Sequence, residues 1–410
     1  MNSDLLILHV IDSLGGSGGS ERQLVVNLQQ FRRPNLKHAV ALLYDLPGSR
    51  ASEIPPSVST EVLFPDRESV PGLLASVIQL RRLVLRLRPD VIHGSLAAAS
   101  LAVRLVGWLT RTPVVESLVN IAYEQVRTTD NPHVTSWKLA LHRWREKATV
   151  PAVSHFHAVS ETVARSWSED LSIPRTKMTV IPRGLPFAAP RNHDRSLARK
   201  LLVEELGLDE DAVMVLNVAR HEPQKGQRYA IESMAELRQE LPGAVLLIAG
   251  RNGTATPLME ETIERLGLEK HVHLLGTRSD IAHLLSAADI FVFPSLFEGS
   301  GGNALLEAMA AGIPTVSIDR PPMTELATNE VDALMVPPQD PSALAEAILR
   351  LTREPELAER LTATAREKAT VPAVSHFHAV SETVARSWSE DLSIPRTKMT
   401  VIPRGLPFAA

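Results

Sequence analysis

The 410-residue chain contains no cysteine. This absence excludes disulfide bonds, thiolate zinc sites and thiol nucleophiles, and it fits a reducing compartment. Aromatic residues are scarce, at 4%, and neither sign of charge dominates, because 43 Lys and Arg residues face 47 Asp and Glu residues. With a net charge of -4 the protein has no general attraction to nucleic acid, and we expect no nucleic-acid partner.

Long hydrophobic runs are absent as well. The longest apolar region, from Val91 to Trp108, is interrupted by His93, by two serines and by Arg104, so we expect no membrane-spanning helix. The N-terminal run LLILHVI is too short for the apolar segment of a signal peptide and continues into glycines, so it predicts a first strand. These features predict a cytoplasmic protein.

Short apolar runs alternate with helical patterns along most of the chain. One series includes LLILHVI, HAVALLYDL and PVVESLV, and a second, from Met214, includes VMVLNVAR, AVLLIAG and IFVFPS. This alternation predicts an α/β fold with parallel sheets covered by helices on both faces, and the length favours two such doubly wound domains. We place them at residues 1–190 and 191–361, with a proline-containing linker near residues 185–196.

One block of the sequence occurs twice. Arg145 to Ala189 recurs without a mismatch as Arg366 to Ala410. Structural repeats are tandem and numerous, so one distant copy indicates a recent duplication, or a join of two sequences at the shared REKAT. The first copy stands where it would complete the sheet of the first domain, and we expect residues 366–410 to add little stability.

A glycine-rich loop in PSLFEGSGGNALLEAMAAG separates two acids, Glu298 and Glu307. IFVFPS predicts a buried strand before the loop and ALLEAMAAG predicts a helix after it, so free backbone N–H groups converge at an anion site. The groups that would line this site are Gly299, Gly301, Gly302 and Asn303. Glu298 could accept from sugar hydroxyls and Glu307 could hold a ribose diol, or both could be solvated acids near a helix dipole.

The stretch resembles the acid, glycine loop, acid motif of family 4 glycosyltransferases of the GT-B fold, and five further segments resemble that family in the same order. NVARHEPQKGQ is similar to its donor-phosphate segment, with Arg220 and Lys225 as the paired cations, and LGTRSDIAHLL, with Arg278, is similar to its nucleotide-base region. HAVSETVARSW with VIPRGLPF resembles the domain crossover, and MTELATNEVDALMVPP resembles the last strand and helix. GGSGGSERQL, with Gly18, Gly19 and Glu21, resembles the loop facing the acceptor.

The resemblance implies two Rossmann-like domains facing across a cleft. It also implies a retaining transfer of a sugar from a nucleotide-diphosphate sugar to a glycan, lipid or small-molecule acceptor, with Arg220, Lys225 and Glu298 as catalytic residues. Two cations beside the diphosphate can stabilise the leaving group without a metal, so we expect neither a metal nor another cofactor. A GT-B sugar-nucleotide epimerase and a non-catalytic nucleotide-sugar binding protein are the alternatives.

Two departures from the family pattern bear on the site. Eight residues separate Glu298 from Glu307, whereas the family usually has seven. The position of the family's histidine after the fourth or fifth strand is occupied by Val119, so its role is absent or is taken by Asn120 or His93.

Other motifs favour ordinary structural roles. The run Asp209-Glu210-Asp211 precedes a strand, which favours a solvated turn over a metal site, and His155 with His157 favours a packed or hydrogen-bonded pair. GGSGG lacks the G-x-G-x-x-G spacing of a dinucleotide site. QLRRLVLRLR carries Arg81, Arg82, Arg86 and Arg88 around an apolar stripe. It predicts a surface helix, with peripheral contact to an anionic membrane as the alternative.

Overall fold

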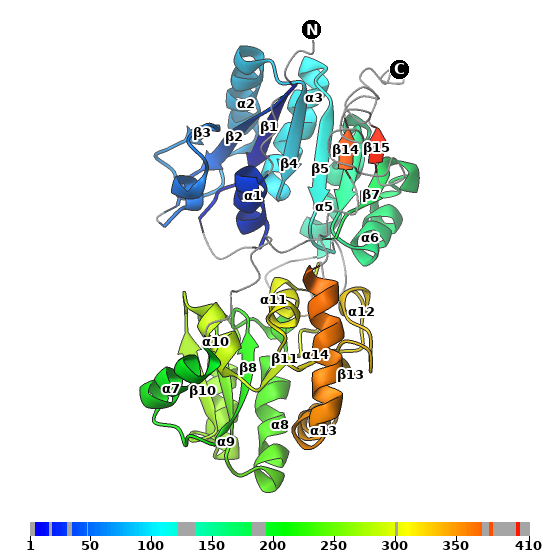
Figure 1. Cartoon of the computed structure of the whole chain (residues 1–410). Coiled ribbons are helices and arrows are strands. Elements are labelled where there is room, and N and C mark those ends of the chain that lie inside the picture. Colours follow the sequence, from blue (N-terminus) through cyan, green and yellow to red (C-terminus); the bar gives the residue numbers. More distant parts are fainter. Residues whose placement is uncertain are drawn as a thin grey trace. The chain divides into compact units, whose positions relative to one another are not determined.

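The computed structural model describes residues 5–15, 19–30, 35–46, 48–121, 136–182, 194–299, 302–370, 377–379 and 399–401. The chain divides into two compact units, Met1–Pro182 with Val374–Ala410, and Arg183–Ala373 (Figure 1). Of the linker predicted near residues 185–196, only residues 194–196 are described, so that prediction stays a prediction. Within the described residues, no helix combines the length and the apolar composition needed to cross a bilayer.

The first unit contains a seven-stranded sheet in the order β3-β2-β1-β4-β5-β6-β7, in which every neighbouring pair is parallel. Its strands are β1 (Leu5–Ile11), β2 (Leu36–Tyr44), β3 (Ser59–Phe64), β4 (Val91–Ser95), β5 (Val114–Leu118), β6 (His155–Ala158) and β7 (Met178–Val180). The chain leaves β1 toward one edge of the sheet and leaves β4 toward the other. Right-handed crossovers then place the helices that follow β1 and β4 on opposite faces.

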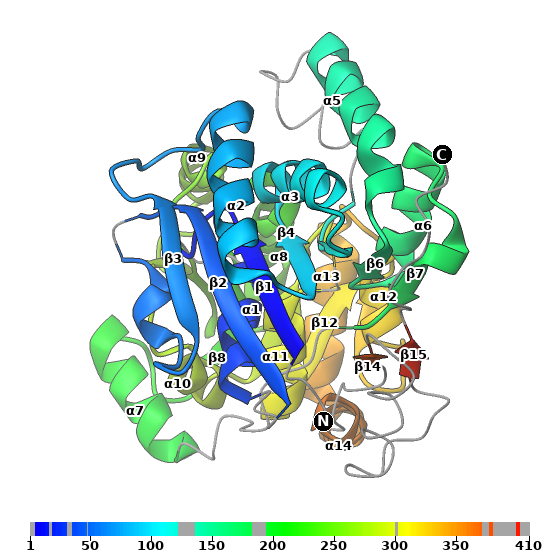
Figure 2. The same ribbon diagram turned by 90° about the horizontal axis from the view of Figure 1, so that it is seen from above.

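In the described part of this unit, five α-helices connect the strands: α1 (Gly19–Gln30), α2 (Leu73–Leu87), α3 (Ala97–Thr110), α5 (Ser136–Thr149) and α6 (Glu161–Leu171). Helix α3 packs against β1, β4 and α2, and Figure 2 shows α2 and α3 side by side. A Cβ at Gly94 would lie 3.5 Å from Val103, an ordinary van der Waals distance, so this packing does not require glycine. Helix α6 begins after Ser160, whose hydroxyl accepts from the Val163 N–H in the manner of an N-cap.

The second unit contains a six-stranded parallel sheet in the order β10-β9-β8-β11-β12-β13. Its strands are β8 (Val213–Val218), β9 (Ala244–Ala249), β10 (Val272–Gly276), β11 (Ile290–Phe293), β12 (Thr315–Ile318) and β13 (Leu334–Val336). Alternate residues enter two different cores, since Val215 and Val292 pack on one face whereas Met214 and Phe291 pack on the other. The prediction of two doubly wound parallel-sheet domains is therefore confirmed.

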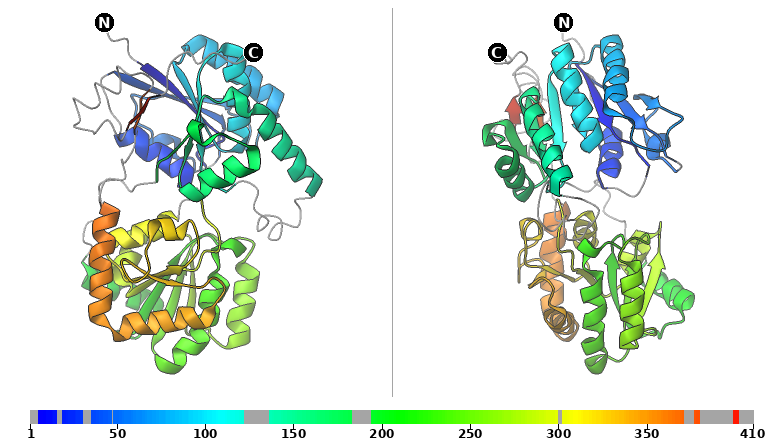
Figure 3. Two further views of the ribbon diagram at one scale, coloured as in Figure 1. Left: turned by 90° about the vertical axis from the view of Figure 1, so that its right-hand side faces the viewer. Right: turned by 180° about the vertical axis from the view of Figure 1, so that it is seen from behind.

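The helices of the second unit are α7 (Arg195–Leu206), α8 (Gln227–Glu240), α9 (Thr256–Leu266), α10 (Ile281–Ala287), α11 (Asn303–Ala311), α12 (Met323–Leu326), α13 (Pro341–Arg353) and α14 (Pro355–Thr370). Helix α14 packs against α11 and α13 (Figure 3). It supplies Leu361 to one core and Ala365 to the other, so it contributes to the interior of the unit up to its last turns.

The two copies of the duplicated block have different surroundings. In the first copy, β6 and β7 belong to the seven-stranded sheet, with Phe156 opposite Met178. In the second copy, β14 (Phe377–Ala379) and β15 (Met399–Val401) pair in the same parallel register, with Phe377 opposite Met399, but form a sheet of their own. The shared REKAT ends α5 in one copy and α14 in the other. Identical residues thus serve as the end of a helix in both units.

Candidate active site

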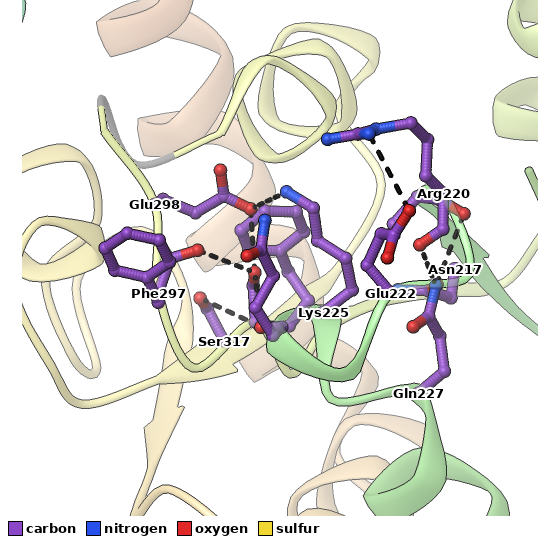
Figure 4. A network of polar contacts seen from close by, with 12 residues as sticks. Asn217, Arg220, Glu222, Lys225, Gln227, Phe297, Glu298 and Ser317 are labelled. Atoms are coloured by element: carbon purple, nitrogen blue, oxygen red, sulfur yellow. Dashed lines mark hydrogen bonds and ion pairs between the residues drawn. The ribbon is translucent and has the colours of Figure 1, made fainter. Parts of the chain in front are cut away.

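The predicted donor residues of the second unit, except Arg278 after the edge strand β10, lie where the strand order of its sheet reverses. Strands β8 and β11 are parallel neighbours, and the chain proceeds from them toward opposite edges of the sheet. The carboxyl ends of two such strands form the usual ligand crevice of a doubly wound sheet. The segment with Arg220 and Lys225 follows β8, and the segment with Glu298 follows β11, so the strand order brings these predicted groups together (Figure 4).

Lys225 and Glu298 form an ion pair in which little of either side chain meets solvent. The exposed fractions are 14% for Lys225 and 13% for Glu298, and the same Glu298 Oε1 also accepts from the Ser295 hydroxyl at 2.7 Å. The backbones of the two segments are joined as well, because the Leu296 N–H donates to the Gln224 carbonyl at 2.8 Å. A Cβ at Gly226 would lie 2.0 Å from the Pro294 carbonyl oxygen, so only glycine permits this approach.

Arg220 is the more open of the two cations, with 42% of its side chain exposed. Its guanidinium lies 3.8 Å from the Glu222 carboxylate. Its backbone is held firmly, since the Gln227 side chain donates to the Arg220 carbonyl at 2.9 Å. The fully buried Asn217 donates to the Val292 carbonyl at 2.9 Å and so ties the ends of β8 and β11 together.

The glycine loop leads directly into α11. Gly302 precedes the helix with φ +89°, a region that favours glycine, and a Cβ there would lie 2.3 Å from the Phe293 ring. The first N–H groups of α11, beginning at Asn303, lie where the anion site is predicted. Glu307 lies one turn further along and is half-buried, and Gly299 is buried. Gly301 lies outside the described residues.

Arg278, predicted near the nucleotide base, is engaged with two carboxylates. It donates to both oxygens of Asp280, at 2.8 and 2.7 Å, and it also pairs with Glu205 of α7. The hydrogen bonds from Arg278 hold the pKa of the Asp280 carboxyl below its usual value. Two acids thus orient the Arg278 guanidinium. Its contact with a nucleotide base remains a prediction.

Sequence reasoning missed a third loop at this site, the one that follows β9. Glu222 accepts from the Thr254 hydroxyl at 2.8 Å, and the fully buried His221 bonds to the Thr256 hydroxyl at 3.1 Å. Burial holds the pKa of His221 below its usual value. Gly253 is required here, because a Cβ would lie 2.3 Å from the His221 carbonyl oxygen. The sequence feature that could have indicated this loop is the pair of glycines in AGRNG, directly after a predicted strand.

The predicted acceptor residues lie near the corresponding switch point of the first sheet, after β1 and β5. Helix α1 begins at Gly19 and holds Glu21 in its first turn, whereas Gly18 lies outside the described residues. Asn120 follows β5 with an exposed side chain, and its carbonyl accepts from the Trp167 indole at 2.7 Å. Val119, which occupies the position of the family's histidine, directly precedes Asn120.

Asp12, which the sequence did not single out, follows β1 at this same edge. Its carboxylate accepts from the Ala99 N–H of α3 at 2.6 Å. Burial raises the pKa of Asp12 to about 6, backbone hydrogen bonds oppose the shift, and the charge of Glu21 adds to it.

The histidines of the first sheet form a hydrogen-bonded chain within one face. His93 bonds through Nδ1 to His9 at 3.0 Å and through Nε2 to the Ser117 hydroxyl at 2.8 Å. The Ser117 hydroxyl reaches His157 at 3.0 Å, and burial lowers the pKa of His93 to about 4. Both ring nitrogens of His93 are thus occupied inside the sheet. His155 bonds to the Thr179 hydroxyl at 2.8 Å, which confirms the prediction of hydrogen-bonded histidines.

The run Asp209-Glu210-Asp211 forms an exposed turn ahead of β8, as predicted. Among the described residues, no group of three or more His, Asp and Glu side chains is arranged to hold a metal ion.

Comparison with known proteins assigns both units. The family described as Glycosyltransferase Family 4 matches residues 17–188, and the family described as Glycosyl transferases group 1 matches residues 198–368. The chain is 27% identical over 284 residues to the UDP-Gal:alpha-D-GlcNAc-diphosphoundecaprenol alpha-1,3-galactosyltransferase of Escherichia coli, covering 68% of this chain and 70% of that protein. It is 34% identical over 188 residues to the alpha-D-kanosaminyltransferase of Streptomyces kanamyceticus, but spans only 47% of that relative.

Solved structures agree with this assignment at the level of the fold. Anabaena Alr3699/HepE in complex with UDP superposes with a TM-score of 0.74 at 21% identity, covering 95% of this chain and all of that one. The glycosyltransferase WaaG gives a TM-score of 0.69 at 16% identity, covering 89% of this chain and 95% of that one. With both family matches in order along the chain and both doubly wound sheets in place, the protein belongs to the family 4 (group 1) glycosyltransferases of the GT-B fold.

Proposed function

We propose that the protein transfers a sugar, with retention of anomeric configuration, from a UDP-sugar to a lipid-linked or glycan acceptor. One observation carries the proposal: the segment with Arg220 and Lys225 follows β8, and the loop that leads into α11, the helix with Glu307, follows β11, at the switch point of the second sheet. The choice of UDP follows the relatives, one named for UDP-Gal and one solved with UDP. The lipid-linked acceptor follows the diphosphoundecaprenol substrate in the name of the Escherichia coli relative.

The proposed chemistry needs charge stabilisation and positioning. The bond from the acceptor oxygen to the anomeric carbon forms on the face from which the bond to the diphosphate breaks, and a phosphate oxygen takes the acceptor proton. Arg220 and Lys225 stabilise the charge that develops on the leaving diphosphate, which is the work a metal performs in other transferases. Glu307 holds the ribose diol and Arg278 lies at the base, while Gly19, Glu21 and Asn120 face the acceptor.

Release of nucleoside diphosphate tests this proposal against its alternatives. The full chain is incubated with UDP-, GDP- and ADP-sugars, with and without a GlcNAc-diphospholipid. A transferase releases UDP when the acceptor is present, an epimerase rearranges the sugar without needing the acceptor, and a binding protein does neither.

We expect UDP release in the presence of EDTA, because the two cations serve in place of a metal. Activity that disappears in EDTA and returns with manganese would contradict metal independence.

We further propose that the protein works at the inner face of the cytoplasmic membrane, through the outer surface of α2 and α3. Leu74 of α2 is 75% exposed and Trp108 of α3 is 61% exposed, with Leu85 and Leu109 also exposed. Arg81, Arg82 and Arg88 are exposed and have no ion-pair partner in the described part of the chain, whereas Arg86 pairs with Glu61. Exposed apolar groups beside unpaired arginines fit an anionic lipid surface.

Vesicle binding tests the membrane surface. We expect the full chain to sediment with vesicles containing phosphatidylglycerol and not with pure phosphatidylcholine, and we expect Trp108→Ser with Leu85→Ser to abolish sedimentation. The matched control is Leu197→Ser with Leu201→Ser, since these leucines of α7 are also exposed, at 55% and 48%. Equal loss in the control would show that the α2 and α3 surface has no special role.

A further inference from the structure

The role of Glu298 is constrained by what its carboxylate already contacts. Glu298 Oε1 accepts from Lys225 and from Ser295, and the side chains of all three residues are largely buried. In Figure 4 the carboxylate faces the Lys225 ammonium within the network at the end of β8. A carboxylate that is paired and almost enclosed does not exchange its partner easily, because separating a nearly buried pair leaves two desolvated charges.

The same geometry leaves Lys225 able to bind a ligand. An ammonium group has three donors, and within the described part of the chain Glu298 is the only acceptor that Lys225 contacts. Arg220, the neighbouring cation of the same loop, is exposed enough to meet an anion directly. A negative partner beside Lys225 also holds its ammonium group in place before the donor arrives.

The position of Glu298 does not depend on the lengthened glycine loop. Its two partners, Ser295 and Lys225, and the backbone bond from Leu296 to Gln224 all lie ahead of that loop. The extra residue separates Glu298 from Glu307, so the two acids need not act on one ligand as a unit. Glu298 belongs structurally with Lys225.

We infer that Glu298 is a positioning residue that sets Lys225 for the donor diphosphate, and that it acts on the phosphates rather than on the transferred sugar. This inference rests on the proposed function, because it presupposes a nucleoside diphosphate at the switch point. It has a direct consequence. Binding of UDP, which lacks the transferred sugar, depends on Glu298, and this dependence disappears once Lys225 is removed.

A double-mutant cycle in UDP binding tests the inference. Affinities of the full chain for UDP and for uridine are measured by calorimetry or by competition for Glu298→Gln, Lys225→Met and the double variant. We expect Glu298→Gln to weaken UDP binding about tenfold, the size of one charge-assisted hydrogen bond, with uridine affinity unchanged. We expect the double variant to bind UDP no more weakly than Lys225→Met alone.

Two further variants separate positioning from a structural role. Glu298→Asp keeps the charge and should recover part of the UDP affinity. Glu232→Gln removes a carboxylate of α8 that pairs with Arg228 and is 19% exposed, and it should leave the ratio of UDP to uridine affinity unchanged. A fall in that ratio with Glu232→Gln would show that loss of any ion pair in this unit perturbs the site.

The outcomes distinguish the two proposals. If wild-type protein fails to bind UDP and releases no UDP from UDP-sugars, the proposed function fails. If wild type binds UDP and Glu298→Gln binds it equally well but turns over UDP-sugar slowly, only the positioning role is wrong and Glu298 contacts the sugar. Additive losses in the double variant would likewise overturn the inference.

Discussion

The two cations of the donor site have different surroundings, and this difference sets what their removal should do. Arg220 is 42% exposed and lies 3.8 Å from the Glu222 carboxylate, whereas Lys225 is 14% exposed and pairs closely with Glu298. Both serve the diphosphate in the proposed mechanism. Only Lys225 also neutralises a nearly buried acid.

We predict that Arg220→Ala and Lys225→Met each lower turnover of UDP-sugar by ~10²-fold or more, because each removes charge stabilisation of the leaving group. Arg220→Ala should leave the thermal midpoint unchanged. Lys225→Met should lower it, since Glu298 is left without its cation. Initial rates and melting curves of both variants check this, and a fall in midpoint for Arg220→Ala as large as that for Lys225→Met would contradict the distinction.

Glu307 allows a second test at the residue scale. If Glu307 holds the ribose diol, Glu307→Gln should bind UDP more weakly than wild type does. The variant and wild type should bind 2′,3′-dideoxy-UDP with nearly the same affinity. Equal losses with UDP and with the dideoxy nucleotide would show that Glu307 does not contact the ribose.

The sequence indicated most of these residues but not their partners. Arg220, Lys225, Glu298 and Glu307 stand in a recognisable order, and the glycines between the acids require a tight turn. The pairing of Lys225 with Glu298 depends on β8 and β11 being neighbours, which follows from strand order and not from sequence spacing. Asp12 was missed for the same reason, since its partner Ala99 lies in the first turn of α3, which follows another strand.

At the scale of elements, the histidine chain crosses five strands of the first sheet that are not consecutive in the sequence. It runs from His38 through His9, His93, Ser117 and His157 to the Ile181 carbonyl. The strands that carry these side chains are ordered β2-β1-β4-β5-β6. Neighbouring strands are in parallel register with His9 opposite His93 and Ser117 opposite His157, so the side chains share one face.

The Ile181 carbonyl at the end of the histidine chain determines the tautomer of every neutral ring in it. Since a carbonyl can only accept, His157 donates to Ile181 through Nε2 and accepts from Ser117 through Nδ1. Ser117 then accepts from His93 Nε2, and His93 Nδ1 accepts from His9. Proton addition to His93 would leave His93 and His9 with two facing N–H donors unless His9 changed tautomer. The hydrogen bonds of the histidine chain therefore favour uncharged imidazoles.

We predict that acid weakens the first unit through these histidines. Burial lowers the pKa values of His93 and His155 to about 4 from an ordinary 6.5, so the folded state holds them neutral. Their stabilising contribution is complete above pH 6.5 and is lost as the pH falls toward 4, by ~1.4 kcal/mol per pH unit for each histidine. Asp12, with its pKa raised to about 6, opposes this trend.

Urea unfolding between pH 7 and pH 5 measures this dependence. His93→Gln should reduce the pH slope of the unfolding free energy, because one buried imidazole no longer titrates. His283→Gln is a suitable control, since His283 lies on α10 of the second unit. A slope unchanged by His93→Gln and reduced by His283→Gln would place the acid sensitivity outside the histidine chain.

On the scale of the whole chain, the first copy of the duplicated block is built into the first unit by a buried charge network. Arg104 is fully buried and binds Glu116 through two hydrogen bonds of 2.7 Å and Glu146 through an ion pair of 2.8 Å. Glu146 belongs to the first REKAT, and burial raises the pKa of its carboxyl while Arg104 opposes this. The sequence could show that this copy completes a sheet but not that it also supplies an anion to the core.

The second REKAT is integrated in the second unit in another way. Lys368 pairs with Asp332 at 2.7 Å, and Asp332 is 2% exposed. Arg366 donates to the Ala311 carbonyl at 3.0 Å near the end of α11. The expectation that residues 366–410 add little stability stays a prediction, and these contacts argue against it for the first five residues, which end α14. The sequence showed that REKAT is shared, and the buried partner of Lys368 came only from the fold.

We predict that the boundary of the dispensable segment lies at Thr370. A chain ending at Thr370 keeps the whole of α14 and the pair between Lys368 and Asp332, so its melting temperature and UDP affinity should match those of the full chain. A chain ending at Ala365 leaves the carboxylate of Asp332 buried without its cation. Because an unpaired buried charge is costly, the shorter chain should lose ~1–3 kcal/mol of unfolding free energy.

The duplication itself provides the matched control for this prediction. Lys147 is the equivalent of Lys368 in the first copy, and it only bonds to the Ser172 hydroxyl at 3.0 Å on the surface. In the full chain, Lys368→Met should therefore reproduce most of the loss caused by ending at Ala365, whereas Lys147→Met should cost little. If the chain ending at Thr370 unfolds as readily as the one ending at Ala365, residues beyond α14 contribute to the fold. If Lys147→Met is as harmful as Lys368→Met, the sequence of the block rather than its surroundings sets its contribution.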